Sequence, residues 1–193
     1  MTPLPAWLTS TLASDGAAGR GALPGWIQAL SPEAVVVGPA LVVAVAHNDN
    51  RAMRAVPDAV QGPGTVLVVS CGEESTTAIL GEIIARELLG AGIVAVVTDG
   101  LIRDRRDVAA AGLPVWARGV TPVASAKEGP DQVGGSVTIG GVAVSDGDIV
   151  VADADGVVIW PAADVERFVA AADAKRRSDD ERMARLTGAG GLG

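Results

Sequence analysis

One stretch of the chain, residues 98–107, carries the side chains best suited to chemistry. It holds the acid Asp99, then the adjacent pair Arg103-Asp104, then a further acid, Asp107. A short run of valine, isoleucine and alanine precedes it, which predicts a buried strand. In α/β proteins the loops that follow buried strands carry much of the chemistry. Carboxylates hold hard cations such as Mg²⁺ or Mn²⁺, and a neighbouring arginine holds an oxyanion, so this loop predicts a metal-assisted site.

The same acids also have a structural interpretation. Asp104 would be the N-cap of a short helix near residues 105–111, and Asp107 would stand three residues later as a weak capping box. The two roles are compatible, because a capping aspartate can also bind an ion. The residues of this loop alone leave both roles open.

A second candidate element is Gly81-Glu82-Ile83-Ile84, where a glycine and an acid interrupt an apolar helical pattern. We expect an amphipathic helix over residues 76–89, in which a central glycine costs about 1 kcal/mol relative to alanine. If the helix instead begins near Gly81, its free N–H groups are available to bind a carboxylate. A solvated surface position for Glu82 remains the alternative.

The rare residue types exclude several kinds of chemistry. The chain has one histidine and one cysteine, so a multi-histidine zinc site, a cysteine-rich metal site and an internal disulfide framework are excluded. Neither of its lysines, Lys127 and Lys175, lies in an apolar sequence context that would lower its pKa, so Schiff-base catalysis is not expected. No Walker or Rossmann fingerprint is present. Carboxylate and arginine chemistry remains.

Charge and hydropathy limit the partners and the compartment. The net charge of −8 argues against a nucleic-acid partner, because phosphate binding needs a basic face. No stretch reaches the roughly 20 apolar residues of a membrane span, and no signal peptide is evident. The single cysteine suits a reducing compartment, so we expect a cytoplasmic protein that does not associate with membranes.

The elements that must position these residues follow an α/β order. Hydrophobic residues make up 49% of the 193 residues but aromatic residues only 3%, so aliphatic side chains must build the core. Gly38-Pro39 separates the first two expected strands. Strands are expected at 35–37, 41–46, 65–70, 92–97, 114–117, 137–139, 142–144, 149–152 and 157–160, and helices at 50–60, 76–89 and 162–186. We expect one domain over residues 1–187 and a flexible glycine-rich tail over residues 188–193.

These motifs, taken in order, resemble a known family. The chain resembles the family shared by the regulator of ribonuclease activity A (RraA) and the class II 4-hydroxy-4-methyl-2-oxoglutarate (HMG) aldolases. The resemblance covers most of the chain, from Val36 to Val169. Each motif alone is a weak indication of the family, but their order and spacing together are highly specific for it. They are Gly38-Pro39-Ala40, Asp49-Asn50, Gly81-Glu82, Asp99-Gly100, Arg103-Asp104, the run from Pro114 to Gly119, Gly140-Gly141, Gly147-Asp148 and the run from Ala152 to Val158.

The resemblance implies a fold and an assembly. The fold is an α/β/β sandwich, a swivelling-type β/β/α domain with a long C-terminal helix. The assembly is a homotrimer, in some members stacked into a hexamer, with sites between subunits. An acid from a neighbour's C-terminal helix would complete each site, and Asp179, Asp180 and Glu181 remain open for that role.

The resemblance also implies roles for the site residues. Asp104 would bind the divalent metal, Mg²⁺ or Mn²⁺, and Arg103 would contact the substrate. The segment from Gly81 through Ile83 to Ile84 would bind the pyruvyl carboxylate through backbone N–H groups, and Glu82 would help to hold a water on the metal. Members without aldolase activity tend to lack the acid that matches Asp107, which is present here.

The implied activity is cleavage of 4-hydroxy-2-oxo acids, such as HMG, to pyruvate. Oxaloacetate decarboxylation passes through the same enolate and would accompany it. Two departures from the family pattern, Ser145-Asp146 in place of a usual proline and an untypical loop at 128–135, bear on the substrate and not on the metal site. The alternative is a non-catalytic regulator that binds a ribonuclease or another partner protein.

Overall fold

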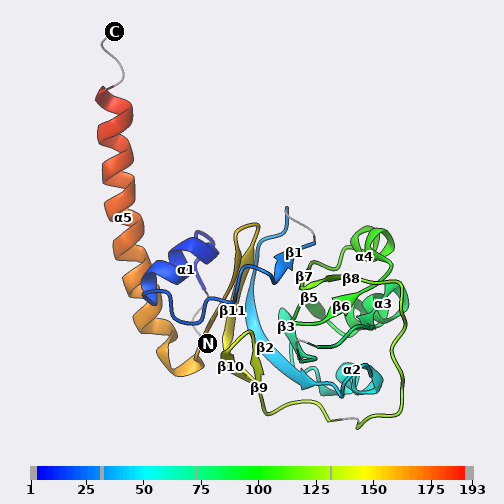
Figure 1. Ribbon diagram of the computed structural model, residues 1–193. Coiled ribbons are helices and arrows are strands. Elements are labelled where there is room, and N and C mark those ends of the chain that lie inside the picture. The colour runs from blue at the N-terminus through cyan, green and yellow to red at the C-terminus, as the bar shows by residue number, and fades with distance from the viewer. Residues whose placement is uncertain (1–3, 31–32, 73, 131, 190–193) are drawn as a thin grey trace.

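A twisted seven-stranded sheet organises the residues that the computed structural model describes, which are 4–30, 33–72, 74–130 and 132–189 (Figure 1). Its order is β1 (Gln28–Ala29), β7 (Val115–Ala117), β5 (Ile93–Thr98), β3 (Thr65–Ser70), β2 (Val36–Ala44), β11 (Ile149–Asp153) and β12 (Gly156–Trp160). β2, β3, β5 and β7 run parallel, while β1, β11 and β12 pair antiparallel at the two ends. The central strands are almost continuously aliphatic, as parallel strands covered on both faces must be.

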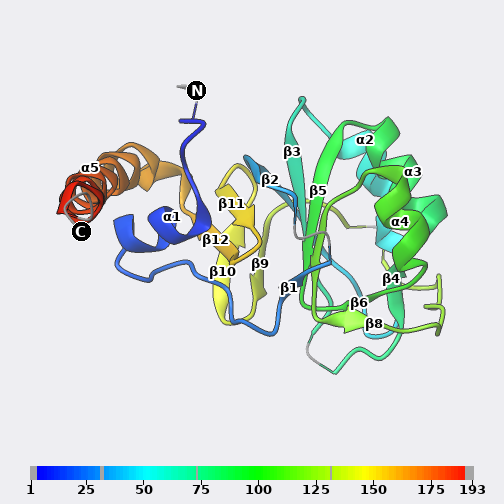
Figure 2. The same ribbon diagram turned by 90° about the horizontal axis from the view of Figure 1, so that it is seen from above.

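Short helices cover one face of the parallel strands, as Figure 2 shows. They are the 3₁₀ helix η1 (Arg51–Ala55), α2 (Val56–Ala59), α3 (Glu82–Gly90) and α4 (Arg105–Ala111). Beside them lies a small parallel sheet of β4 (Ala78–Leu80), β6 (Leu101–Ile102) and β8 (Gly119–Val120). Leu67, Val96 and Leu88 belong to the apolar cluster that joins this layer to the main sheet.

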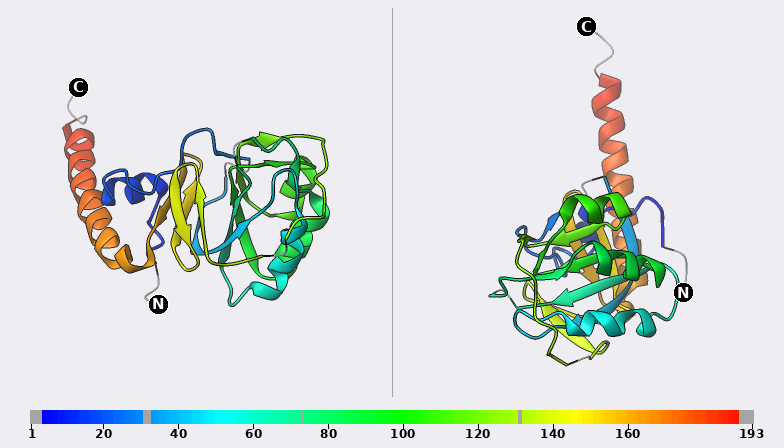
Figure 3. Two further views of the ribbon diagram at one scale, coloured as in Figure 1. Left: turned by 60° about the horizontal axis from the view of Figure 1, so that its bottom comes forward. Right: turned by 90° about the vertical axis from the view of Figure 1, so that its right-hand side faces the viewer.

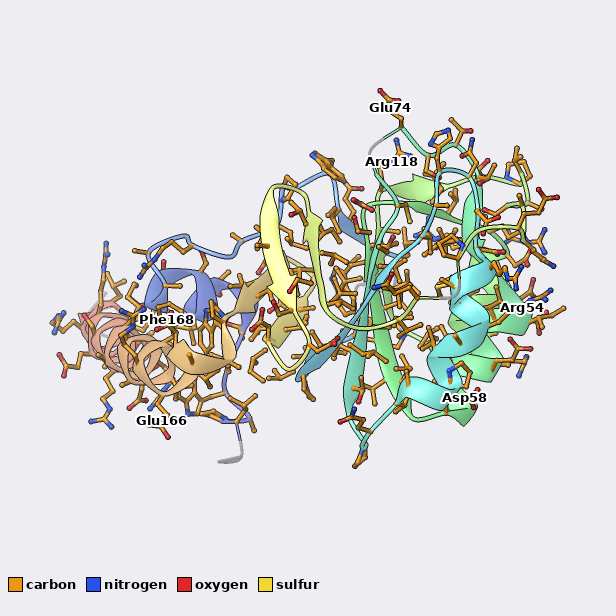
Figure 4. All side chains as sticks on the ribbon, turned by 90° about the horizontal axis from the view of Figure 1, so that it is seen from below. Arg54, Asp58, Glu74, Arg118, Glu166 and Phe168 are labelled. Atoms are coloured by element: carbon orange, nitrogen blue, oxygen red, sulfur yellow. The ribbon has the colours of Figure 1, made fainter. Side chains whose placement is uncertain are left out.

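A second β layer covers the other face of the parallel strands, and three helical segments pack on the outer face of β11 and β12. The hairpin of β9 (Ser136–Ile139) and β10 (Val142–Ser145) packs Ile139 and Val144 onto the sheet. Beyond β11 and β12 lie α1 (Ser10–Gly16), the 3₁₀ helix η2 (Ala162–Asp164) and the start of α5 (Val165–Ala189). Phe168 points from α5 toward the sheet, and its ring centroid lies 5.4 Å from that of Trp160. Glu166, on the same helix, points away from the sheet (Figure 4).

The first expected strand pair is one continuous strand, β2. Its first half pairs antiparallel with β11 and its second half pairs parallel with β3, so Gly38-Pro39 marks a change of partner rather than a turn. A Cβ at Gly38 would overlap the carbonyl oxygen of Gly64. The glycine therefore allows a close approach of two backbones and does not end the strand.

The segment expected to be one helix over residues 76–89 is a short strand followed by a shorter helix. Residues 78–80 form β4, and α3 begins at Glu82 with Gly81 as its N-cap residue. β4 pairs in parallel with β6, and this tertiary pairing overrides the helical spacing of its three apolar residues. The alternative that the helix begins near Gly81 is the correct one.

Helix α5 projects away from the body of the molecule (Figures 1 and 3). It continues through Ala189, so the expected tail from Gly188 is wrong for its first two residues, and residues 190–193 lie outside the described part. No helix in the described ranges is both long enough and apolar enough to cross a bilayer. The single domain over residues 1–187 stays a prediction.

Candidate active site

A cavity of about 160 Å³ brings together the two segments that the sequence singled out. Its wall consists of Asn50, Ala78, Leu80, Gly81, Ile83, Ile84, Arg103, Ala124, Ser125 and Lys127. Drug-sized ligand pockets are typically about 300–1,000 Å³, so this cavity fits a metabolite of a few carbon atoms.

The topology of the small sheet explains why these segments meet. Leu80 at the end of β4 is paired with Ile102 at the end of β6, and the backbone N–H of Arg103 donates to the carbonyl of Leu80 at 2.9 Å. The carboxyl ends of parallel strands lie at the same edge of a sheet. Gly81 and Arg103 follow those ends directly, so the start of α3 lies beside the Arg103-Asp104 pair.

The start of α3 offers hydrogen-bond donors to the cavity. Gly81 has no side chain to cap the helix, and the first bond within the helix is from the N–H of Ala85 to the carbonyl of Gly81, at 3.0 Å. The N–H groups of Ile83 and Ile84 precede that bond and have no acceptor within the helix. Both residues line the cavity, so their N–H groups are candidates for binding a carboxylate there.

Asp104 takes an unusual backbone conformation at the same edge. Its φ and ψ of 54° and 37° lie in the left-handed region, which few residues other than glycine adopt. It occupies the N-cap position of α4, but its side chain makes no cap hydrogen bond, so the capping interpretation is wrong for the carboxylate. Strained backbone of this kind often marks functional positions.

The Asp104 carboxylate instead faces α3. Its Oδ2 accepts from the N–H of Glu82 at 3.3 Å and lies 3.5 Å from Nε of Arg103. A Cβ at Gly81 would overlap that same oxygen and would lie 2.9 Å from Cγ of Arg103. The glycine therefore leaves the space in which the carboxylate and the guanidinium lie.

The donor set fits a hard divalent cation held partly by this chain. Within the described residues, Oδ1 of Asp104 makes no hydrogen bond or ion pair, and no three acidic, histidine or cysteine side chains form a complete metal site. Mg²⁺ commonly keeps several waters and takes one or two protein carboxylates together with substrate oxygens. Asp104 would be such a carboxylate, with water, substrate or another chain supplying the other ligands.

The other predicted acids have different environments. Glu82 turns its carboxylate along α3 to Arg86, with 2.9 Å between the charged groups. Asp107 lies exposed on α4 and, within the described ranges, has no hydrogen-bond or ion-pair partner. Asp99 is buried away from the cavity wall and accepts from the N–H of Cys71 at 2.6 Å. Burial raises the pKa of that thiol to about 12, so Cys71 is not a nucleophile at neutral pH.

The three acids of the C-terminal helix are not near this cavity within one chain. α5 and the α3–α4 edge lie at opposite sides of the molecule (Figure 1). On α5, Asp179 is paired with Lys175 and Asp180 with Arg176, both one turn earlier. Glu181 is exposed and makes no such pair within the described part of the chain. Only another subunit's helix would bring one of these acids to the site.

Sequence reasoning missed three polar residues of the cavity wall, namely Asn50, Ser125 and Lys127. Asn50 donates from Nδ2 to the carbonyl of Ile79 at 3.1 Å, and the Ser125 hydroxyl donates to the carbonyl of Ala78 at 2.8 Å. Lys127 is exposed and supplies a second cation, in addition to Arg103, to the cavity wall. The signal available was a lysine among polar loop residues, which gave no indication of its distance from Gly81 and Arg103.

Comparison with known proteins relates most of the chain to one family. Residues 10–159 match the RraA-like family, described as Aldolase/RraA. The chain is 36% identical over 176 residues to a Halalkalibacterium halodurans protein named "Putative 4-hydroxy-4-methyl-2-oxoglutarate aldolase". The matched region covers 91% of this chain and 83% of that protein. It is 35% identical over 113 residues to the Thermus thermophilus protein named 4-hydroxy-4-methyl-2-oxoglutarate aldolase, covering 58% of this chain and 68% of that one.

A solved structure shares the fold. Streptomyces coelicolor RraAS2, described as an unusual member of the RNase ES inhibitor RraA protein family, matches with a TM-score of 0.80 at 32% identity. The match covers 91% of this chain and 93% of that one. This similarity confirms the predicted α/β/β fold class.

Proposed function

The chain belongs to the RraA-like family, and from that premise we propose that it is a divalent-metal-dependent (class II) aldolase. Its substrates would be 4-hydroxy-2-oxo acids such as 4-hydroxy-4-methyl-2-oxoglutarate, which it cleaves to pyruvate. One observation supports this most: a single cavity joins the free N–H groups of α3 to Arg103, with the Asp104 carboxylate beside them. Such a cavity has separate groups for a carboxylate, an oxyanion and a cation.

Each group of the cavity would bind a different part of the substrate. The N–H groups of Ile83 and Ile84 would bind the carboxylate next to the keto carbon. Arg103 would donate to the keto oxygen, where negative charge develops during the reaction. A cation bound at Asp104 would act as a Lewis acid on that oxygen. Lys127, which also lines the cavity, would attract the second carboxylate of a dicarboxylate substrate.

Bond cleavage then needs one base. Glu82 would take the proton of the C4 hydroxyl, directly or through a water, as that oxygen becomes a carbonyl. The C3–C4 bond breaks, and its electron pair moves onto C3 to give the enolate of pyruvate, with its charge on the oxygen that faces Arg103. Protonation of C3 gives pyruvate. The side chain of Glu82 is 40% exposed, so water reaches it.

Oxaloacetate decarboxylation would use the same site without that base. Loss of carbon dioxide leaves the C–C bond electrons on C3, so the same enolate forms and no hydroxyl proton has to move. The side chains that bind and polarise the oxo acid are therefore needed for both reactions. Glu82 is needed for aldol cleavage alone.

Metal removal tests the proposal. We expect pyruvate release from both HMG and oxaloacetate to stop in EDTA and to return with Mg²⁺ or Mn²⁺, measured with a lactate-dehydrogenase-coupled assay. Borohydride should trap no adduct with pyruvate, because neither lysine acts as a Schiff-base former. Full turnover in EDTA would exclude the metal-dependent mechanism.

The alternative function is a non-catalytic regulator that binds a ribonuclease or another protein. It is supported by the similarity to the RNase ES inhibitor RraA family. Lack of pyruvate release from any 4-hydroxy-2-oxo acid or oxaloacetate, together with inhibition of a purified ribonuclease E-type enzyme, would favour this function.

A further inference from the structure

The turn after β2 links segments that surround the cavity. Asn48 accepts through Oδ1 from the N–H of Thr76 at 2.8 Å, just before β4. Asn50 contributes directly to the cavity wall. Asp49 lies between these two residues with only 6% of its surface exposed, although it is a charged residue. A buried carboxylate is costly unless it is fully hydrogen-bonded.

Asp49 meets this requirement with three backbone donors. Its Oδ1 accepts from the N–H of Arg51 at 2.8 Å, within its own turn. Its Oδ2 accepts from the N–H groups of Glu128 and Gly129, at 2.7 and 3.1 Å, in a segment nearly eighty residues later. Burial alone would raise the pKa of Asp49, yet these N–H donors hold the pKa below its usual value. The carboxylate is therefore an ionised clamp on a distant loop.

Lys127 lies inside the segment that this clamp holds. On one side of it, Ala126 exchanges two backbone hydrogen bonds with the turn, donating to the carbonyl of Asn48 and accepting from the N–H of Asn50. On the other side, Glu128 is held by Asp49. The backbone of Lys127 is thus held by hydrogen bonds on both sides, and the residue lines the cavity.

We propose that Asp49 is a positioning residue that fixes Lys127 at the cavity and so sets the affinity for substrates with a second carboxylate. The identity of those substrates rests on the proposed function; the positioning itself does not. A lysine on a mobile loop would lose more side-chain and backbone freedom on binding an anion than one whose backbone is already held. Selectivity for dicarboxylates over monocarboxylates would come from this difference.

Gly129 gives a second way to disturb the clamp. A Cβ at this position would lie 2.9 Å from Oδ1 of Asp49 and 3.1 Å from Cβ of Ala46, so the residue must be small for the loop to approach. Gly129→Ala would push the segment from the carboxylate without altering Asp49 or Lys127. It serves as the second variant in case Asp49→Asn does not fold.

Steady-state kinetics test the proposal. We expect Asp49→Asn and Gly129→Ala each to raise KM for HMG about tenfold and to change kcat by less than twofold. KM for a monocarboxylate such as 4-hydroxy-2-oxopentanoate should change less than twofold. Lys127→Met should reproduce this pattern, and the double variant Asp49→Asn/Lys127→Met should be no worse than Lys127→Met alone, because both changes remove the same interaction.

A matched control comes from another acid that clamps a loop. Asp146 accepts from the N–H groups of Val42 and Gly135, at 2.8 and 2.6 Å, but is not part of this cavity wall. Asp146→Asn should leave both KM values unchanged. If KM for both kinds of substrate rises equally, or if the double variant shows the product of the single effects, the proposal is wrong.

Amide hydrogen exchange separates this inference from the proposed function. In the intact protein, Asp49→Asn should speed exchange at Glu128 and Gly129 at least tenfold and leave the amides of β3 unchanged. This readout needs no activity, so an inactive wild-type protein would refute the proposed function while still testing the clamp. Unchanged exchange at Glu128 and Gly129 would overturn the positioning role.

Discussion

Among single residues, Asp104 combines a backbone conformation that favours glycine with a side chain that could bind a metal ion. Its left-handed φ of 54° favours glycine, yet the residue carries a carboxylate that makes no capping bond. Its Oδ2 contacts the start of α3, and its Oδ1 has no hydrogen-bond or ion-pair partner among the described residues. A residue that is strained and does not cap is better explained by binding than by helix stability.

Two substitutions at Asp104 separate the role of its carboxylate in binding from the effect of its backbone conformation on stability. Asp104→Ala and Asp104→Gly should both abolish Mn²⁺ binding, measured by electron paramagnetic resonance, and pyruvate release. Because only glycine adopts the left-handed region freely, the alanine variant should be about 1 kcal/mol less stable than the glycine variant in urea unfolding. An active glycine variant would show that the carboxylate has no role in the reaction.

Glu82 and Arg103 should be separable by reaction type. Glu82→Gln removes the proposed base, so aldol cleavage should fall about 100-fold while oxaloacetate decarboxylation falls less than fivefold. Arg103→Lys keeps the charge but loses the planar fork, so both reactions should slow together. Kinetics on the two substrates check this. Equal losses for Glu82→Gln would remove Glu82 from the role of base.

At the scale of elements, the site depends on how β4 leads into α3. β4 ends at Leu80, which pairs with the last residue of β6, and a single glycine then leads into the helix. The first turn of α3 thereby contributes Ile83 and Ile84 to the cavity wall. A capping side chain at Gly81 would occupy the donors, and any Cβ there would displace Asp104 and Arg103.

The two ends of α3 offer a matched pair of glycines. Gly81→Ala should lower pyruvate affinity at least tenfold, because a Cβ would overlap Oδ2 of Asp104 and crowd Arg103. Gly90→Ala meets nothing within 4 Å at the other end and should leave binding unchanged, with stability unchanged or up to about 1 kcal/mol higher. Calorimetric titration with pyruvate and Mn²⁺ measures both. Normal binding by Gly81→Ala would contradict the packing argument.

At the scale of the whole molecule, α5 is the feature that one chain leaves unexplained. Only its first part packs against α1 and the sheet, through residues such as Phe168 and Ala172. The rest extends outward with Met183 and Leu186 exposed, as Figure 3 shows for the helix as a whole. An extended charged helix of this kind is suited to reach another subunit. Family resemblance, rather than this geometry, gives the expected trimer or hexamer.

Subunit mixing tests whether sites are shared. Truncation before Ser178 should lower activity at least tenfold while light scattering still shows the oligomer. Mixing truncated chains with Asp104→Ala chains should restore part of the activity, because each defect then lies on a different chain. Among the three acids, Glu181→Gln should have the largest effect, since Asp179 and Asp180 are already paired within the helix. A monomeric wild-type protein at micromolar concentration would rule out the shared site.

The main strands, and the residues that directly follow them, could be predicted from the amino-acid pattern alone. Apolar runs at residues 65–70 and 92–97 predicted buried strands because turn residues bound them and they are too short for helices, and the structure has strands at 65–70 and 93–98. Glycine-containing turns predicted the later hairpins, and a long charged segment predicted the last helix. Gly81 and Arg103-Asp104 stood out because a glycine, an arginine and acids interrupt apolar patterns. The proximity of these two segments was expected from family resemblance, not from periodicity.

Tertiary structure decided what local patterns could not express. Residues 78–80 have helical spacing but form a strand, because β6 supplies the hydrogen-bond partners. Gly38-Pro39 stays within β2, because β11 pairs with the first half of that strand and β3 with the second half. Lys127 comes to the cavity because the buried carboxylate of Asp49 binds backbone N–H groups nearly eighty residues away. Such contacts depend on distances between remote segments, and the spacing of residues along a chain does not record those distances.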